Sequence, residues 1–335
     1  MSSPMAGYEA FLVKNVSTIS SIESTLRSLT WFLPGRFKDA ELASEALSSL
    51  LNMTSMYHDT LLTTFTQNSR PPVPTSLHFR YTQAWLDKDV RYRWIGRVLE
   101  LIRYTQLVIE MGLKRKVSSK NRWRGIVLLE VVKAVLRLML LRITKRPLVH
   151  PPLPEREFDP STLPDLDSER TSPHPLFNKS SPSSADSPVE DYLLPKALST
   201  SNVRPPVTLI SPLASPQDWV SEVLYTLRPL VYCVLYASDR NTKRPLVAIL
   251  LLELLSRTLR RAPPPSAILE CSEYAHRDRD VFWYLLRGSI WQHFSRPKLE
   301  ALAHKVGRAP LVGLFGALLE DWIPLIDEYY YYTAP

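Results

Sequence analysis

Apolar residues in the first 70 positions repeat at helical spacing. Four aliphatic side chains recur at i, i+3, i+7 and i+10, namely Ile19, Ile22, Leu26 and Leu29. This spacing places them on one face of an α-helix. The Leu-Pro-Gly sequence at 33–35 predicts the end of that helix, because proline cannot continue it. A second apolar run extends from Leu47 to Phe65, and prolines beginning at Pro71 stop it. The pattern therefore predicts two helices before residue 70.

The same periodicity continues through most of the chain. It predicts a helix over about 85–113 and a more apolar one over about 122–144. A further helix is expected from about Gln217 past Val231, bent at Pro229, and another begins near Pro245, a residue well suited to a first turn. The remaining expected helices span about 267–294, 296–307 and 310–331. Strand-like alternation with Asn-Gly or Asp-Gly turns does not occur, so the predicted fold class is all-α.

A proline-rich segment divides these helices into two groups. Residues 147–216 contain 15 of the 29 prolines, many serines and no glycine. This composition favours an extended, disordered linker over a packed domain. We therefore expect an N-terminal helical part over 1–146, a disordered linker over 147–216 and a C-terminal helical part over 217–335, with the two helical parts packed as a bundle.

Two helices carry their charges in an unusually narrow stripe. Residues 126–141 include twelve Ile, Val, Leu or Met residues, and their charged residues are Glu130, Lys133 and Arg137. At 100° per residue these three lie within about 60° of each other, and three charged residues in 246–260 repeat the pattern. A surface helix of a soluble protein usually has a wider polar face. Such helices are either buried deep in a bundle or embedded in lipid, and the sequence leaves both readings open.

The sequence gives reasons against an independent transmembrane helix at 126–141. The twelve apolar residues contribute roughly −4 to −7 kcal/mol to insertion, whereas each central charge costs about 2.5 to 3.5 kcal/mol. Basic residues flank both ends, which suits a helix in the interface of an anionic membrane, with Trp123 as an interfacial anchor. The candidate membrane-contact residues are Arg122, Trp123, Arg124, Arg142, Lys145 and Arg146.

Candidate chemistry is sparse. The cluster His276-Arg-Asp278-Arg-Asp280 is interpreted as a solvated charge run, and His58-Asp59 as a structural pair. Two cysteines cannot form a disulfide framework or a metal cage, and no catalytic or phosphate-binding motif occurs. We therefore expect no enzymatic activity, no cofactor, no metal site and no catalytic residue. The net charge of +8 suits an anionic partner, but no nucleic-acid-binding signature accompanies it, so nucleic acid is not an expected partner.

Several segments, taken in order, resemble the peroxin-16 family. Its opening block is similar to Tyr8–Asn15 and Thr25–Phe37, and its central block to Glu110-Met-Gly112, Arg122-Trp123 and Lys133–Arg137. After the linker, Glu222–Leu230, Tyr284–Arg287 and the stretch from Leu319 to Tyr332 resemble further family blocks. The joint order of these blocks carries the resemblance, because none of them is specific alone.

The resemblance implies a non-enzymatic factor for building the peroxisomal membrane. In the family this means recruiting or docking membrane proteins, with peroxin-3 as a membrane partner, peroxin-19 as a carrier and the membrane lipid surface as a third contact. The implied location is the peroxisomal membrane, reached directly or by way of the endoplasmic reticulum. The alternative function is a helical membrane-associated scaffold or tether at another organelle.

Overall fold

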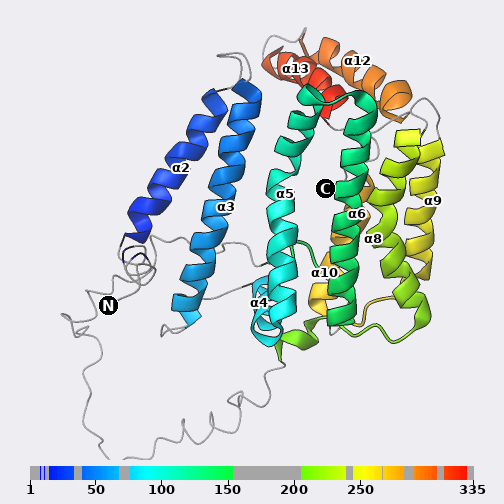
Figure 1. Ribbon diagram of the computed structural model, residues 1–335. Helices are drawn as coiled ribbons and strands as arrows, with labels where there is room; N and C mark the ends of the chain where they lie inside the picture. The colour runs from blue at the N-terminus through cyan, green and yellow to red at the C-terminus, as the bar shows by residue number, and fades with distance from the viewer. Residues whose placement is uncertain are drawn as a thin grey trace, which may run out of the picture. The chain divides into compact units, whose positions relative to one another are not determined.

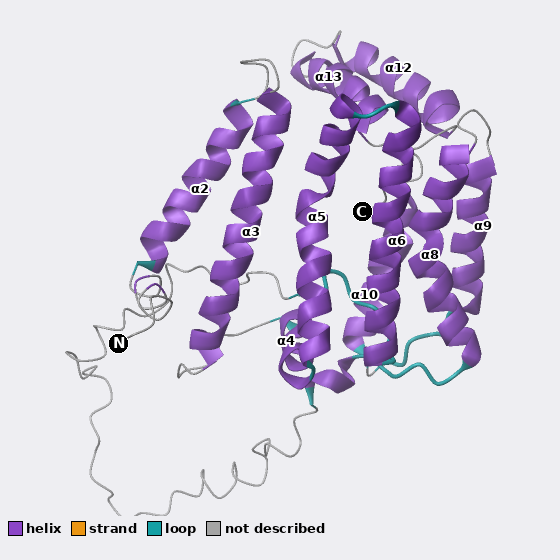
Figure 2. Ribbon diagram, in the orientation of Figure 1, coloured by secondary structure: helices purple, strands orange, loops and turns teal. Residues whose placement is uncertain are grey.

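The computed structural model describes residues 8, 11, 15–33, 40–67, 76–153, 205–238, 244–265, 267–282, 290–307 and 313–329. Within these residues the regular structure is helical and no strand occurs (Figures 1 and 2), so the predicted all-α class is confirmed. The chain forms two compact units: residues 1–81 with 154–208, and residues 82–153 with 209–335.

The first unit contains a helical hairpin. Helix α2 (Val16–Phe32) ends just before the Leu-Pro-Gly sequence, as predicted, and packs antiparallel to α3 (Ala40–Gln67). His58 of α3 joins the two helices, because its Nδ1 lies 2.5 Å from a carboxylate oxygen of Glu23. The Nε2 of His58 lies 2.7 Å from the hydroxyl of Tyr8, so both ring nitrogens have partners and the imidazole is fixed in orientation.

Two helices occupy the region for which the sequence predicts a single helix over 85–113. Helix α4 (Leu77–Lys88) ends one residue before α5 (Val90–Lys116) begins. Asp89 separates them in an extended conformation, and its carboxylate accepts a hydrogen bond of 2.8 Å from the backbone N–H of Arg91. This N-cap satisfies a donor that the first turn of α5 leaves without an intrahelical partner. The periodicity of the apolar residues continues across the break, which is why it concealed the boundary.

The second unit is built on four long helices. Helix α5 packs against α6 (Ser119–Thr144), α6 against α8 (Pro216–Ser238), and α8 against α9 (Arg244–Leu259), as Figure 1 shows. Pro229 lies inside a continuous α8, and Pro245 occupies the first turn of α9 as predicted. Helix α10 (Ile268–Asp280) lies behind this layer in the view. The layer joins helices that lie on opposite sides of the predicted linker in the sequence.

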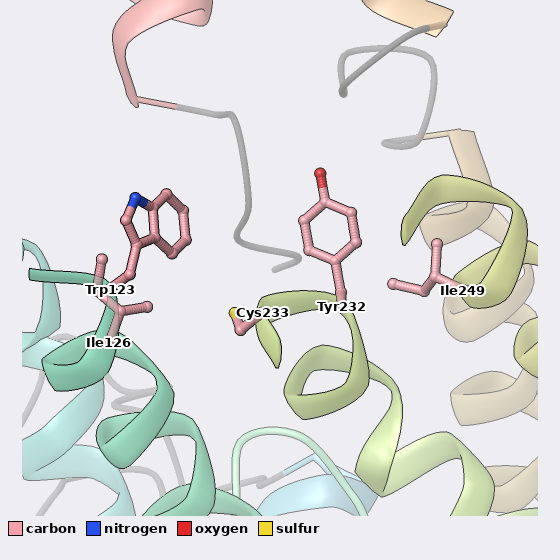
Figure 3. Close-up of a cluster of buried hydrophobic side chains, with 5 residues drawn as sticks. All are labelled: Trp123, Ile126, Tyr232, Cys233 and Ile249. Atoms are coloured by element: carbon pink, nitrogen blue, oxygen red, sulfur yellow. The ribbon is translucent and has the colours of Figure 1, made fainter. Parts of the chain in front are cut away.

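An apolar cluster joins three helices of this layer, α6, α8 and α9. Trp123 and Ile126 of α6 meet Tyr232 and Cys233 of α8, and Ile249 of α9 completes the cluster (Figure 3). All five side chains are buried. Burying side chains of this size stabilises a fold by roughly 1.5–3 kcal/mol each, so the cluster is a main source of cohesion for α6, α8 and α9.

Both ends of the predicted linker, residues 147–153 and 209–216, belong to the second unit. The backbone N–H of Leu213 donates to the carbonyl of Lys145 at 2.9 Å, and the Tyr92 hydroxyl donates to the Pro152 carbonyl at 3.0 Å. Buried side chains include Leu148 on one side and Ile210 on the other. The expected disordered linker of 147–216 is therefore too long at both ends, and residues 154–204 lie outside the described residues. The predicted three-part division of the chain otherwise stays a prediction.

The last described helices form a second hairpin. A π-helical turn (Trp291–Ser295) leads into α12 (Arg296–Gly307), which packs on α13 (Gly313–Tyr329). Trp291 and Ile323 are buried together, with Leu299 packed against them. A short 3₁₀ helix (Pro206–Leu209) completes the described elements. The expected helix over 267–294 is seen only as α10 and the π-helical turn, because residues 283–289 lie outside the described part of the chain.

Candidate functional site

The charged stripe of α6 faces the interior of the second unit. Glu130 is 3% exposed, and the Nζ of Lys133 lies 2.6 Å from its carboxylate. Lys133 also donates to the side-chain carbonyl of Gln106 on α5 at 2.8 Å, and the Gln106 amide donates to Glu110 at 2.9 Å. A chain of polar contacts therefore joins α5 to α6 where an ordinary bundle would place aliphatic side chains.

Burial changes the acidity of one member of this chain. Loss of solvation raises the pKa of Glu110 to about 7, although the hydrogen bond from Gln106 and the nearby charge of Lys133 both favour the ionised form. Ionisation of this carboxyl therefore occurs near physiological pH.

The contact between α8 and α9 is also polar. Arg228 of α8 forms a buried ion pair with Glu253 of α9. The Ser221 hydroxyl donates to the Ser256 carbonyl at 2.7 Å, and the Ser256 hydroxyl donates to the Ser221 carbonyl at 3.0 Å. Reciprocal serine bonds of this kind require close approach of the two backbones, so they fix the register of α8 against α9.

Arg277 of α10 is the centre of the third polar contact. Its guanidinium donates to Glu222 of α8 at 2.7 Å and to the carbonyl of Leu148 at 2.5 Å. The rings of Tyr225 and Tyr274 lie 4.2 and 5.4 Å from its central carbon. Burial by itself lowers the pKa of Arg277, but the anionic Glu222 and its neighbours raise it above its usual value. The interpretation of residues 276–280 as a solvated run is wrong for Arg277, which is buried, whereas His276 is exposed.

These contacts assign a structural role to the interior charges. Glu130, Glu222 and Glu253 each lie against a cation on their own or a neighbouring helix. Buried ion pairs of this kind hold helices in position, because breaking one would leave an uncompensated charge in the interior. No group of three or more possible metal ligands occurs in the part of the chain that the structure describes.

On α6, α8 and α9, exposed aliphatic side chains lie on the side of each helix that faces away from its buried acid. In α6, Leu128 is 65% exposed, and in α9, Leu251 and Leu254 are 60% and 59% exposed. The full set, which we call the apolar face, is Leu128, Val131, Val132, Val135 and Met139 of α6, Val220 and Val234 of α8, and Val247, Leu251, Leu254 and Leu255 of α9. On each helix these residues lie roughly 100–200° around the axis from the buried acid. Exposed aliphatic side chains gathered on one side of a helix indicate an interaction surface.

Acidic and basic side chains of α6, α8 and α9 are also distributed unevenly between the interior and the surface. The acidic residues of α6, α8 and α9 are Glu130, Asp218, Glu222 and Glu253, and every one of them is buried. The exposed charged residues of α6 and α9 are all basic: Lys120, Arg124, Arg142, Arg244 and Arg257. The outer surface of the three-helix layer is therefore apolar and cationic, without an exposed acid.

The predicted membrane-contact residues have different positions in the structure. Arg124, Arg142 and Lys145 are exposed, whereas Arg122 is half-buried. Arg146 is also half-buried, and its guanidinium donates to the Ile210 carbonyl. Trp123, expected as an interfacial anchor, is only 3% exposed and packs with its ring centroid 4.8 Å from that of Tyr236. We therefore place Trp123 in the core and keep the exposed basic residues as candidates.

The apolar face was not identified from the sequence. The sequence feature that relates to it is the narrow charged stripe of α6. This stripe is compatible with a helix buried deep in a bundle or with a helix embedded in lipid. In the structure the charged stripe is buried while the apolar side of the same helix is exposed. Among the described residues, no helix combines the length and the apolar character that crossing a membrane requires.

Comparison with known proteins identifies the family. A family model described as "Peroxisomal membrane protein (Pex16)" matches residues 6–328. The chain is 25% identical over 170 residues to the peroxisomal membrane protein PEX16 of Schizosaccharomyces pombe, which covers 48% of this chain and 46% of that protein. It is also 25% identical over 138 residues to peroxisome biogenesis protein 16 of Arabidopsis thaliana, covering 41% of this chain and 34% of that protein.

The chain thus aligns with less than half the length of these curated relatives. No solved structure matches it. The family match, however, extends over both helical units, including the buried charge network and the apolar face. On this evidence the chain belongs to the Pex16 family of peroxisomal membrane proteins.

Proposed function

We propose that this peroxisome biogenesis factor of the peroxisomal membrane acts without catalysis, by recruiting or docking other membrane proteins there. Membership of the Pex16 family supports a role in peroxisome biogenesis and a location at the peroxisomal membrane. The observation that supports a docking role is the two-sided second unit, which has an apolar, cationic surface on one side and the charged helix α10 on the other. A protein with this distribution can attach to a membrane and still present a polar surface to soluble carriers.

The interior supports a scaffold better than an enzyme. The buried acids contact arginine or lysine side chains. These and related polar contacts join α8 to α9 and α10, and α6 to α5. A docking surface benefits from such rigidity, because less conformational entropy is lost when a partner binds.

The partners that we propose are peroxin-3 in the membrane and peroxin-19 as the carrier, on the basis of the family resemblance. The lipid contact includes the exposed residues Arg124, Arg142 and Lys145. Each basic residue near an anionic surface contributes about 1 kcal/mol to binding, so these three together make a useful but reversible attachment.

Deletion of the gene tests the biogenesis role. We expect cells without this protein to contain few or defective peroxisomes and to grow poorly on fatty acids, and we expect the full-length chain to restore both. Purified full-length protein should also retain peroxin-3 and peroxin-19 in pull-down experiments. Normal numbers of import-competent peroxisomes in a clean deletion strain would exclude the proposal.

A further inference from the structure

We propose that the apolar face of α6, α8 and α9 binds an anionic lipid surface, with the three helix axes lying in the plane of one leaflet. This inference deepens the proposed function and rests on its membrane location. It commits to lipid as the occupant, rather than to a second copy of the chain or another protein. Charge, the two unlike sides of the unit and the position of the basic ends all favour this occupant.

Charge complementarity favours anionic lipid. Arg124 and Arg142 are exposed near the two ends of the aliphatic run of α6, and both project to the side of the helix that carries the apolar face. Their separation of 18 residues corresponds to roughly 27 Å along the helix axis. At the end where α6 begins and α9 begins, Lys120 and Arg244 are exposed as well. Apolar surface between basic groups is the pattern of a helix that lies in a membrane interface.

A second copy of the chain fits this surface less well. Pairing two copies through the apolar face would bring their exposed basic ends together. The acids of α6, α8 and α9 that might neutralise them are buried and already contact cations or backbone N–H groups. An anionic headgroup supplies the missing negative charge without any rearrangement of the interior.

The opposite side of the unit argues for helices parallel to the membrane. Helix α10 packs on the buried side of the layer, through Arg277 to Glu222 and through Asp278 to Arg260 at 2.8 Å. Its outer surface exposes His276 and Arg279. Upright helices would bring these groups towards the hydrocarbon, where a charged side chain is costly. Helices parallel to the membrane leave α10 in water and give the apolar face to the acyl chains.

Vesicle flotation of the full-length protein tests the occupant. We expect binding to vesicles that contain anionic phospholipid, and a loss of about tenfold or more in Leu128→Gln/Leu251→Gln/Leu254→Gln. A matched control, Leu29→Gln/Leu50→Gln/Ile268→Gln, changes three aliphatic residues that are also at least half exposed but lie outside the apolar face. The control should bind like wild type. Arg124→Gln/Arg142→Gln should weaken binding to anionic vesicles and leave any binding to neutral vesicles unchanged.

Depth measurements test the orientation. Leu128→Cys and Met139→Cys, each in a Cys271→Ser background that keeps the buried Cys233, carry an environment-sensitive fluorophore at the introduced cysteine, and lipids with quenchers at defined depths report its position. The two sites are 11 residues apart, or roughly 16 Å along α6. Helices in the plane of the leaflet place both probes at the same shallow depth. Depths that differ by most of that distance would overturn the orientation.

The remaining outcomes are also decisive. If well-folded wild type fails to float while the apolar-face variant abolishes self-association on gel filtration, the surface belongs to a second copy. If wild type neither floats nor self-associates but captures purified peroxin-3 through Leu128 and Leu251, the occupant is protein. Flotation uses only protein and lipid. Its failure would therefore not contradict the biogenesis role, because gene deletion tests that role independently.

Discussion

Glu110 shows how a single buried carboxyl makes stability depend on pH. Its pKa rises from 4.5 to about 7 because burial disfavours the ionised form more than Gln106 and Lys133 favour it. The folded state therefore binds a proton that the unfolded state has lost between these two values. The free energy of unfolding should fall as pH rises from about 4.5 to 7 and then level off, by about 1–3 kcal/mol for this half-buried group.

Substitution of Glu110 by Gln should remove this dependence. The variant keeps a side-chain carbonyl that accepts from Gln106 and carries no charge at any pH. We expect it to match wild type near pH 5 and to be more stable at pH 8, as measured by chemical denaturation monitored by circular dichroism. An unchanged difference between the two pH values in the variant would show that another group titrates.

Arg277 provides a second prediction at the residue scale. In Arg277→Met the carboxylate of Glu222 loses its guanidinium partner while it remains buried. Removing one partner of a buried ion pair typically costs about 3–5 kcal/mol. Adding Glu222→Gln should recover part of that loss, because the uncompensated charge is gone. Denaturation midpoints of the two single variants and the double variant test this, and additive losses would mean that the two side chains do not interact.

At the scale of elements, the crossing of α12 and α13 depends on one glycine. A Cβ at position 316 would lie 2.6 Å from the backbone nitrogen of Gly307 and 2.8 Å from the carbonyl oxygen of Ala303. Neither backbone atom can move without separating the helices. The two backbones therefore approach in the manner of small-residue helix contacts.

We expect Gly316→Ala to loosen this hairpin and to expose Trp291, which is buried beside it. Tryptophan fluorescence should shift to longer wavelength, and limited proteolysis near α12 should become faster. Gly307→Ala is the matched control, since a Cβ there meets no atom within 4 Å. Equal behaviour of the two variants would mean that the crossing does not require Gly316.

At the scale of the whole molecule, the packed ends of the proline-rich segment set how much of it is dispensable. The composition of residues 155–204 offers little apolar material to bury, and the entropy of closing a loop changes slowly with its length. Deletion of 155–204 with a short spacer should therefore preserve complementation of the deletion strain. Extending the deletion to residue 215 removes the buried Ile210 and Leu213 and should abolish it.

Protein levels must be equal in this comparison, so immunoblots accompany the growth assay. Failure of the shorter deletion at normal abundance would show that residues 155–204 carry a required binding motif. Growth of cells that carry the longer deletion would show that the contacts of Ile210 and Leu213 within the second unit are unnecessary for function.

The sequence by itself determined the all-α class, most helix positions and the family, because helical periodicity, proline breaks and ordered sequence blocks are local features. It missed the end of α4, because one capping aspartate interrupts the chain without interrupting the apolar period. Only tertiary structure decided that residues 147–153 and 209–213 are packed, since their burial depends on contacts with Tyr92, Lys145 and Arg261 from other segments. It also decided which side of α6 faces outward, because partners for Glu130 and Lys133 come in part from α5 and make burial of the charged stripe favourable. A helical period shows that a helix has two sides, whereas its neighbours determine which side is covered.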